Sequence, residues 1–325
     1  MRMQSLIQRR RPGRRPPGAS SALAVLLAVA ALLPPAAVTA ESGTLVKAPG
    51  ATLWVEVRGA GAAGGTGAAP LLVVNGGPGF AHDYLHVSDA WDALARNRRV
   101  ALYDQRGNGR SSPLAPGQPC TLADQIADLE AVRAHLGAER IDLLGHSWGG
   151  YLVMAYAARH PQHVAHLIIL DSAAPRWSDT RFLFKEVFPE GTEREDALAF
   201  AAELGDPEPR AASLREYFAM LFYSPDKRDA FLARYGDARI NREVNRSINA
   251  DLARFDLNPE LPKFRFPTLV ATGRYDMNVA PITAYGIHRA IPGSRFVVFE
   301  RSGHLPFYEE PEEFVRTVEA FLSAP

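Results

Sequence analysis

The sequence contains one cysteine, Cys120, among its 325 residues. A single cysteine cannot form a disulfide within the chain, so the fold must be held together by its hydrophobic core. Cys120 lies between prolines and glycines in a predicted loop, and no base stands beside it in the sequence. We therefore interpret Cys120 as a bystander and not as a nucleophile.

The chain also lacks an excess of charge of either sign. It has 36 basic and 36 acidic residues, which argues against the basic surface that a nucleic-acid partner requires. His160, His163 and His166 are close in sequence, but they span a predicted helix end, a loop and a strand start. Because these positions do not have the spacing of metal ligands, we expect no metal site there.

The apolar run at residues 22–33 is too short for a membrane span, which needs about 20 residues. Six arginines precede this run, and Pro34-Pro35 and the small-x-small segment Val38-Thr39-Ala40 follow it. We interpret residues 1–40 as a signal peptide that is cleaved near Ala40. This predicts an exported protein, periplasmic or secreted, and the paired arginines leave both the Sec and the twin-arginine routes open.

The remaining chain alternates short apolar runs with helical patterns. The predicted strands are residues 52–57, 71–74, 100–103, 141–144, 167–170, 268–271 and 296–299. Helical spacing of apolar residues covers residues 122–136, 148–159 and 311–322. Nearly continuous apolar strands that alternate with helices predict a mostly parallel, doubly wound α/β sheet with both faces covered.

One region interrupts this alternation. Residues 174–263 contain no strong strand pattern but are rich in charged and aromatic residues with helical spacing. We predict a helical cap inserted into a core domain made of residues 41–173 and 264–325. The aromatic stripe that includes Tyr217 and Phe218 is more typical of packing than of a substrate-binding wall.

The segment Gly145-His146-Ser147-Trp148-Gly149 lies between a predicted strand and a predicted helix. This setting is typical of a nucleophile elbow, so Ser147 is the candidate nucleophile. A serine needs a base, and His304 follows the last predicted strand. Asp276, after the strand at 268–271, is the candidate carboxylate that orients His304; Asp171, after the strand at 167–170, is its rival.

A tetrahedral oxyanion requires hydrogen-bond donors that are already in place. One candidate is the backbone N–H of Trp148, the residue after the nucleophile. The other comes from the glycine-rich loop Asn75-Gly76-Gly77-Pro78-Gly79, which directly follows an early strand. We assign Gly76 or Gly77 as this donor and prefer Gly77.

Together these segments resemble the prolyl aminopeptidase (proline iminopeptidase) family of α/β-hydrolases. The similar segments are Gly76-Gly77-Pro78-Gly79, His82-Asp83-Tyr84-Leu85, residues 104–111, residues 145–150, Gly273-Arg274-Tyr275-Asp276 and Gly303-His304. The resemblance implies an α/β-hydrolase fold and the release of N-terminal residues, often proline, from short peptides without a metal or cofactor.

Enzymes of this family bind the free ammonium group of the substrate through acidic residues. The branch with His-Asp-Tyr-Leu has Glu directly after the catalytic Asp, whereas this chain has Met277. Glu216 and Glu243 in the predicted cap are the candidate substitutes. Two alternatives stay open: an esterase that acts on small-molecule esters or amides with the same triad, and a non-catalytic binding protein on the same scaffold. The oligomeric state is also open.

Overall fold

The computed structural model describes residues 43–59, 68–203, 207–235 and 240–324, so the expected signal peptide lies outside the described residues. Within them, eight strands form one sheet in the order β1-β2-β4-β3-β5-β6-β7-β8. The strands are β1 (Thr44–Ala48), β2 (Ala51–Arg58), β3 (Leu71–Val74), β4 (Val100–Tyr103), β5 (Ile141–His146), β6 (Val164–Leu170), β7 (Thr268–Gly273) and β8 (Arg295–Phe299).

The sheet is mostly parallel, which confirms the predicted fold class. Strands β3 to β8 run parallel to their neighbours, while β2 pairs antiparallel with both β1 and β4. The sequence analysis missed β1, because this five-residue edge strand has only one buried residue, Val46. The carboxyl ends of the parallel strands meet at one edge of the sheet, where such sheets place their ligands.

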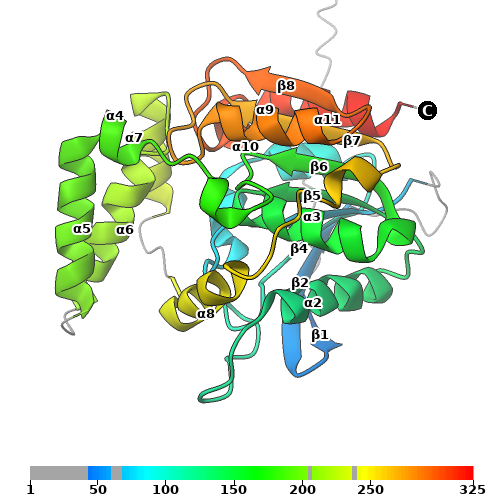
Figure 1. Ribbon diagram of the computed structural model, residues 1–325, viewed down its shortest axis with the longest axis horizontal. Helices are drawn as coiled ribbons and strands as arrows, with labels where there is room; N and C mark the ends of the chain where they lie inside the picture. Colours follow the sequence, from blue (N-terminus) through cyan, green and yellow to red (C-terminus); the bar gives the residue numbers. More distant parts are fainter. Residues whose placement is uncertain (1–42, 60–67, 204–206, 236–239, 325) are drawn as a thin grey trace, which may run out of the picture. The chain divides into compact units, whose positions relative to one another are not determined.

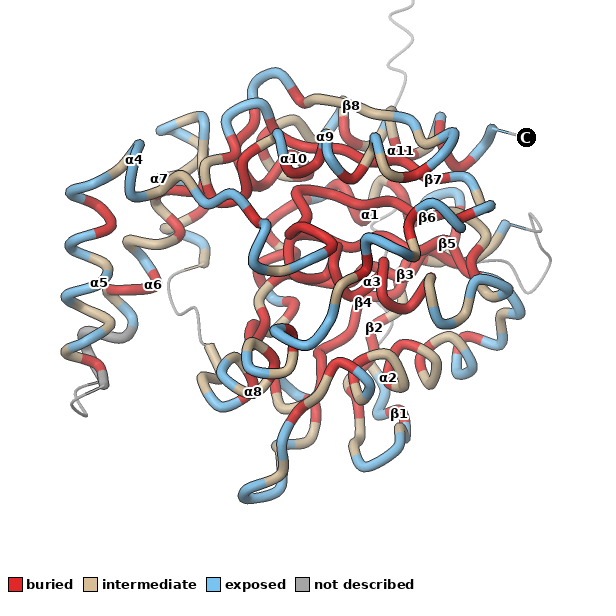
Figure 2. The backbone as a smooth tube through the Cα atoms, in the orientation of Figure 1, coloured by how far each residue is buried: buried red, intermediate tan, exposed pale blue. Residues whose placement is uncertain are grey.

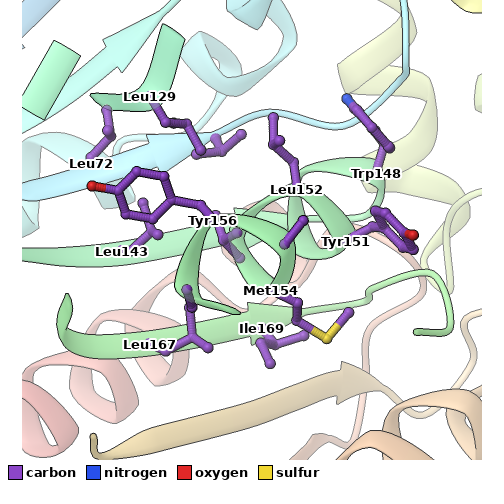
Figure 3. Close-up of a cluster of buried hydrophobic side chains, with 14 of the residues drawn as sticks. Leu72, Leu129, Leu143, Trp148, Tyr151, Leu152, Met154, Tyr156, Leu167 and Ile169 are labelled. Atoms are coloured by element: carbon purple, nitrogen blue, oxygen red, sulfur yellow. The ribbon is translucent and has the colours of Figure 1, made fainter. Parts of the chain in front are cut away.

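The central strands are buried on both faces. Leu72 and Leu143 point to one hydrophobic cluster, whereas their neighbours Leu71 and Leu144 point to the other, as the two-residue repeat of a strand requires. Figure 2 shows these strands as a continuous buried layer. Figure 3 shows Leu72, Leu143 and Ile169 packed beneath α3.

Helices cover both faces of the sheet (Figure 1). Residues of α2, α3 and α9 belong to one cluster, and residues of α1, α10 and α11 belong to the other. The bounds of these helices are α1 (Ala90–Ala95), α2 (Leu122–His135), α3 (Trp148–Arg159), α9 (Pro281–Ala290), α10 (Pro306–Glu309) and α11 (Pro311–Leu322). The connections between elements include the short 3-10 turns η1 (His82–Val87), η2 (Pro161–His163), η3 (Trp177–Asp179) and η4 (Leu261–Lys263).

The segment between β6 and β7 is helical. It contains α4 (Phe184–Val187), α5 (Pro189–Glu203), α6 (Pro207–Ala219), α7 (Pro225–Arg234) and α8 (Arg242–Leu252). Phe218 and Phe231 of α6 and α7 join the same cluster as α1 and α11, whereas Val244 and Ile248 of α8 join the cluster of α2 and α3. We use the term cap for α4 to α7. None of the helices in the described ranges is long and apolar enough to cross a membrane.

Candidate active site

Ser147 occupies a tight turn between β5 and α3. Its backbone has φ 58° and ψ −120°, a region that non-glycine residues rarely adopt outside functional sites. The flanking glycines are required by space: a Cβ on Gly145 would lie 2.2 Å from the carbonyl oxygen of Gly149, and one on Gly149 would lie 2.2 Å from that of Val74. This turn places Ser147 at the carboxyl edge of the sheet, as the elbow interpretation predicted.

His304 and Asp276 lie together at the same edge, in the loops after β8 and β7. His304 Nδ1 lies 2.7 Å from Asp276 Oδ2, and Asp276 Oδ1 accepts the backbone N–H of Val279 at 2.8 Å. A carboxylate can only accept, so the proton of the neutral imidazole stays on Nδ1 and the lone pair on Nε2. Burial lowers the pKa of His304 to about 3, which keeps the ring neutral and able to accept a proton.

The lone pair of His304 has a partner in this structure. Asn278 Nδ2 donates to His304 Nε2 at 3.1 Å, and both His304 and Ser147 line one small cavity. The amide of Asn278 is therefore hydrogen-bonded to the nitrogen that would accept the proton of Ser147. The serine can transfer its proton only after this amide has turned away.

The structure distinguishes between the two glycines that were candidates for the oxyanion donor. The N–H of Gly76 donates to Tyr84 Oη at 2.6 Å, so it is not available to an oxyanion. This leaves Gly77, with Trp148 as the second donor. Gly77 has φ 142°, a conformation that favours glycine over other residues.

Side chains that the sequence analysis did not assign hold the glycine-rich loop in place. Asn75 Nδ2 donates to the carbonyl oxygens of Gly76 and Phe80, at 2.9 and 3.0 Å. Gln105 Nε2 donates to the Asn75 carbonyl at 2.9 Å, and Gln105 Oε1 accepts from Trp148 Nε1 at 2.9 Å. The loop and the first residue of α3 are thus joined through one glutamine.

A second chain of hydrogen bonds connects this loop to the base. Tyr84 Oη accepts from Gly76 and lies 2.7 Å from His146 Nδ1, while His146 Nε2 lies 2.8 Å from the carbonyl oxygen of His304. A carbonyl oxygen only accepts, so His146 donates from Nε2 and accepts the Tyr84 hydroxyl proton at Nδ1. Burial lowers the pKa of His146 well below its usual value, which agrees with a neutral ring.

We expect Tyr84→Phe to lower kcat about 10-fold with little change in KM, because two buried polar groups at the site lose their partner. Steady-state kinetics and the thermal midpoint of unfolding would be measured together. Tyr235→Phe is the matched control, since the centroid of its ring lies 6.5 Å from that of Tyr84 but Tyr235 does not line the Ser147 cavity. Full activity of Tyr84→Phe would show that the chain of hydrogen bonds does not position the glycine-rich loop.

The cavity at Ser147 is narrow and mainly aromatic. Phe80 and Tyr84 line it from the core, and Tyr217, Phe218 and Leu221 line it from the cap. Its volume is about 20 Å³, which is room for about one water molecule. The aromatic stripe was interpreted as packing, but two of its residues, Tyr217 and Phe218, also form the wall of the cavity. A larger substrate requires these side chains to move.

The structure does not bring Glu216 or Glu243 to Ser147, which corrects their assignment as substrate-binding residues. Glu216 pairs with Arg194 at 3.2 Å, and Glu243 is exposed in the first turn of α8. Glu216 lines a separate surface pocket with Arg194, whereas its neighbour Tyr217 lines the cavity at Ser147. No acidic residue in the described ranges lines this cavity.

A further group of histidines and carboxylates lies outside the cavity. His82 Nδ1 lies 2.7 Å from Asp104 Oδ1, and Glu56 Oε2 lies 3.2 Å from His86 Nε2. Arg58 Nε donates to Glu56 at 2.6 Å. Because an arginine already neutralises the central carboxylate, we interpret this group as a buried network of ion pairs.

The comparisons with known proteins agree with this geometry. A family model described as alpha/beta hydrolase fold matches residues 69–311. The proline iminopeptidase of Lactobacillus crispatus is 31% identical over 271 residues, which cover 78% of this chain and 89% of that protein. The proline iminopeptidase of Saccharolobus solfataricus is 30% identical over 269 residues, which cover 78% and 84%.

Solved structures of esterases are also similar. An esterase from Exiguobacterium antarcticum has a TM-score of 0.68 and 25% identity, and the match covers 87% of this chain and 100% of the esterase chain. A thermophilic esterase from Thermogutta terrifontis has a TM-score of 0.65 and 26% identity, with 86% and 98% covered. From the matched family model and the curated relatives, this chain belongs to the α/β-hydrolase family, as a serine hydrolase of the prolyl aminopeptidase-like group.

Proposed function

We propose that this protein is an exported aminopeptidase that releases N-terminal residues, proline among them, from short peptides through an acyl-enzyme. The observation that carries the proposal is the position of His304, whose Nδ1 lies 2.7 Å from Asp276 Oδ2 and whose Nε2 lies 3.1 Å from Asn278 Nδ2 at the Ser147 cavity. The curated relatives named as proline iminopeptidases support the substrate class. Export rests on residues 1–40 and is tested by the N-terminal sequence of the mature protein.

The reaction would begin when Asn278 releases His304 Nε2. Ser147 Oγ attacks the scissile carbonyl while its proton moves to Nε2, and the backbone N–H groups of Gly77 and Trp148 stabilise the oxyanion. His304 then protonates the leaving amine, which departs and leaves an ester on Ser147. Water, deprotonated by His304, hydrolyses this ester and restores the serine.

An esterase on the same triad is the second candidate. It is favoured by the absence of an acidic side chain among the described residues that line the Ser147 cavity. Rates on proline β-naphthylamide and on short acyl esters separate the two candidates. Measurable turnover of the amide that Ser147→Ala abolishes supports the aminopeptidase, whereas turnover of esters alone supports the esterase.

Glu195 of α5 is the cap carboxylate that we propose to bind the ammonium group of the substrate. It accepts the hydroxyl of Ser213 at 2.7 Å. Burial raises the pKa of Tyr217, and the negative charge of Glu195 contributes to this shift. Glu195 therefore lies near Tyr217, which lines the cavity.

We expect Glu195→Gln to raise KM for proline β-naphthylamide about 10-fold, because a charge-assisted hydrogen bond contributes about 1.5–3 kcal/mol. Activity on an uncharged ester would stay unchanged. Glu216→Gln is the matched control, since this carboxylate pairs with Arg194 away from the cavity. Equal effects of Glu195→Gln on both substrates would contradict a role in binding the ammonium group.

A further inference from the structure

Asp171, the residue directly after β6, is under the same kind of backbone constraint as the nucleophile. Within the described ranges, Ser147 and Asp171 are the two non-glycine residues with positive φ, at 58° and 47°. The two positions are also linked, because Ser147 N–H donates to the carbonyl oxygen of Leu170 at 2.9 Å. A fold retains such conformations where the surrounding structure requires them, often at functional sites.

The carboxyl group of Asp171 is completely buried beside the triad. Asp171 and Asp276 both have 0% of their surface exposed, and oxygens of both lie within 4.8 Å of each other and of a nitrogen of His304. Asp171 Oδ1 accepts the N–H of Gly273 at 2.8 Å. Asp171 Oδ2 has no hydrogen-bond donor in the described part of the chain. The carboxyl group of Asp276 is its polar neighbour.

Two adjacent buried carboxyl groups cannot both carry a charge, so one of them keeps a proton. The number of donors shows which one. Asp276 accepts backbone N–H groups of Val279 and Asn278 and faces His304 Nδ1, whereas Asp171 has Gly273 N–H and the Thr272 side chain. The charge is better stabilised on Asp276, so the proton belongs on Asp171.

We propose that Asp171 is a positioning residue of the catalytic machinery, which keeps its proton at neutral pH and donates it from Oδ2 to Asp276. The inference rests on the proposed function only in that Ser147, His304 and Asp276 act together. In this arrangement the pair formed by Asp171, after β6, and Asp276, after β7, carries a single negative charge. The residue that the sequence analysis treated as a rival of Asp276 is then its partner.

The surrounding groups are consistent with this protonation state. Burial, followed by the charge of Asp276, raises the pKa of Asp171 well above its usual range. Burial also raises the pKa of Asp276, but N–H groups of its own loop and the hydrogen bond with Asp171 oppose that shift. The other titratable groups that face the pair are His304, Glu309 and Tyr217, whose charges or hydroxyl interact with Asp276. No cation in this set would hold a second negative charge.

The proposed hydrogen bond has a functional consequence with a definite sign. A donor to Asp276 withdraws negative charge from the oxygen that faces His304, so the imidazolium is stabilised less and the pKa of His304 is lower. Removal of the donor concentrates the charge on Asp276 and raises that pKa. The acid limb of the pH profile, which follows His304, would then move to higher pH.

The test compares Asp171→Asn with Asp171→Ala in the full chain. Asparagine keeps an acceptor for Gly273 and a donor for Asp276, so we expect kcat/KM within about twofold of the wild type and an unmoved acid limb. Alanine keeps neither, and we expect kcat/KM about 10-fold lower with the acid limb about one pH unit higher. If Asp171 were ionised, Asp171→Asn would remove a negative charge near His304, and the acid limb would move to lower pH. This result would overturn the proposal.

Infrared spectroscopy gives a readout that does not depend on folding of the alanine variant. The wild type at neutral pH should show the C=O band of a protonated carboxylic acid that is missing from Asp171→Asn; identical spectra would overturn the proposal. The acid limb is also measured as the pH dependence of the rate of Ser147 labelling by a fluorophosphonate. This reaction needs the triad but no particular substrate, so failure of the aminopeptidase proposal and failure of this one remain distinguishable.

Discussion

Replacing Ser147 with alanine is expected to lower kcat about 10⁴-fold or more on any substrate that the protein turns over, the scale seen when a triad nucleophile is removed. The physical reason is that no acyl-enzyme can form, and water must attack without covalent catalysis. Alanine can occupy the same turn, since it adds no atom to the position. The fold and the thermal midpoint of unfolding should therefore change little.

Fluorophosphonate labelling, followed by intact mass, measures the same effect independently of the substrate. The wild type should gain one adduct, and Ser147→Ala should gain none. Ser178→Ala is the matched control, because Ser178 is an exposed serine outside the cavity. Labelling or substantial turnover of Ser147→Ala would show that another residue is the nucleophile and would refute the proposed mechanism.

Asp276→Asn is expected to lower kcat about 10³- to 10⁴-fold, the size of effect that the equivalent change has in other triads. The amide can point its Nδ2 donors at His304 Nδ1, which must then accept. The ring proton moves to Nε2, and the nitrogen that should receive the serine proton is blocked. Because the change is nearly isosteric, it alters the tautomer more than the shape of the site.

Kinetics of Asp276→Asn from about pH 5 to pH 9 would test the assignment, and Glu300→Gln supplies the control. Glu300, after β8, forms an exposed ion pair with Arg274, after β7. The substitution Glu300→Gln therefore changes the charge near the site without removing a contact of His304. The low pKa of His304 predicts wild-type activity that is still at its plateau near pH 6.5, the usual histidine value. A wild-type rate that falls already above pH 7 would contradict a base kept neutral by burial.

Much of the fold follows from local patterns. The six parallel strands and the helices α2, α3 and α11 were predicted because apolar residues recur at the spacing that each element needs. The edge strand β1 was missed for the same reason: with one buried residue it carries almost no apolar signal. In the cap, the helices were predicted, but which faces pack inward depends on contacts between α6, α7 and the core that no local pattern encodes.

The candidate site divides in the same way. Ser147, Asp276 and His304 were predicted from the sequence because each lies in the segment after a strand, and the parallel direction of these strands brings such segments to one edge of the sheet. The sequence could not show which of Gly76 and Gly77 has a free N–H for the oxyanion, because the N–H of Gly76 is bound by the hydroxyl of Tyr84 only in the folded chain. Glu216 was misassigned because its direction from α6 depends on helix rotation against the core.

The amino-acid order therefore predicted the serine hydrolase class and the candidate triad residues, since these depend on short motifs near strand ends. Tertiary structure alone placed three further contacts: the Tyr84 hydroxyl at the N–H of Gly76, the Asn278 amide at His304 Nε2, and the carboxyl group of Asp171 beside that of Asp276. Each is a contact between loops far apart in the chain. The protonation of such groups depends on burial and on the number of donors in reach, which only the folded chain defines.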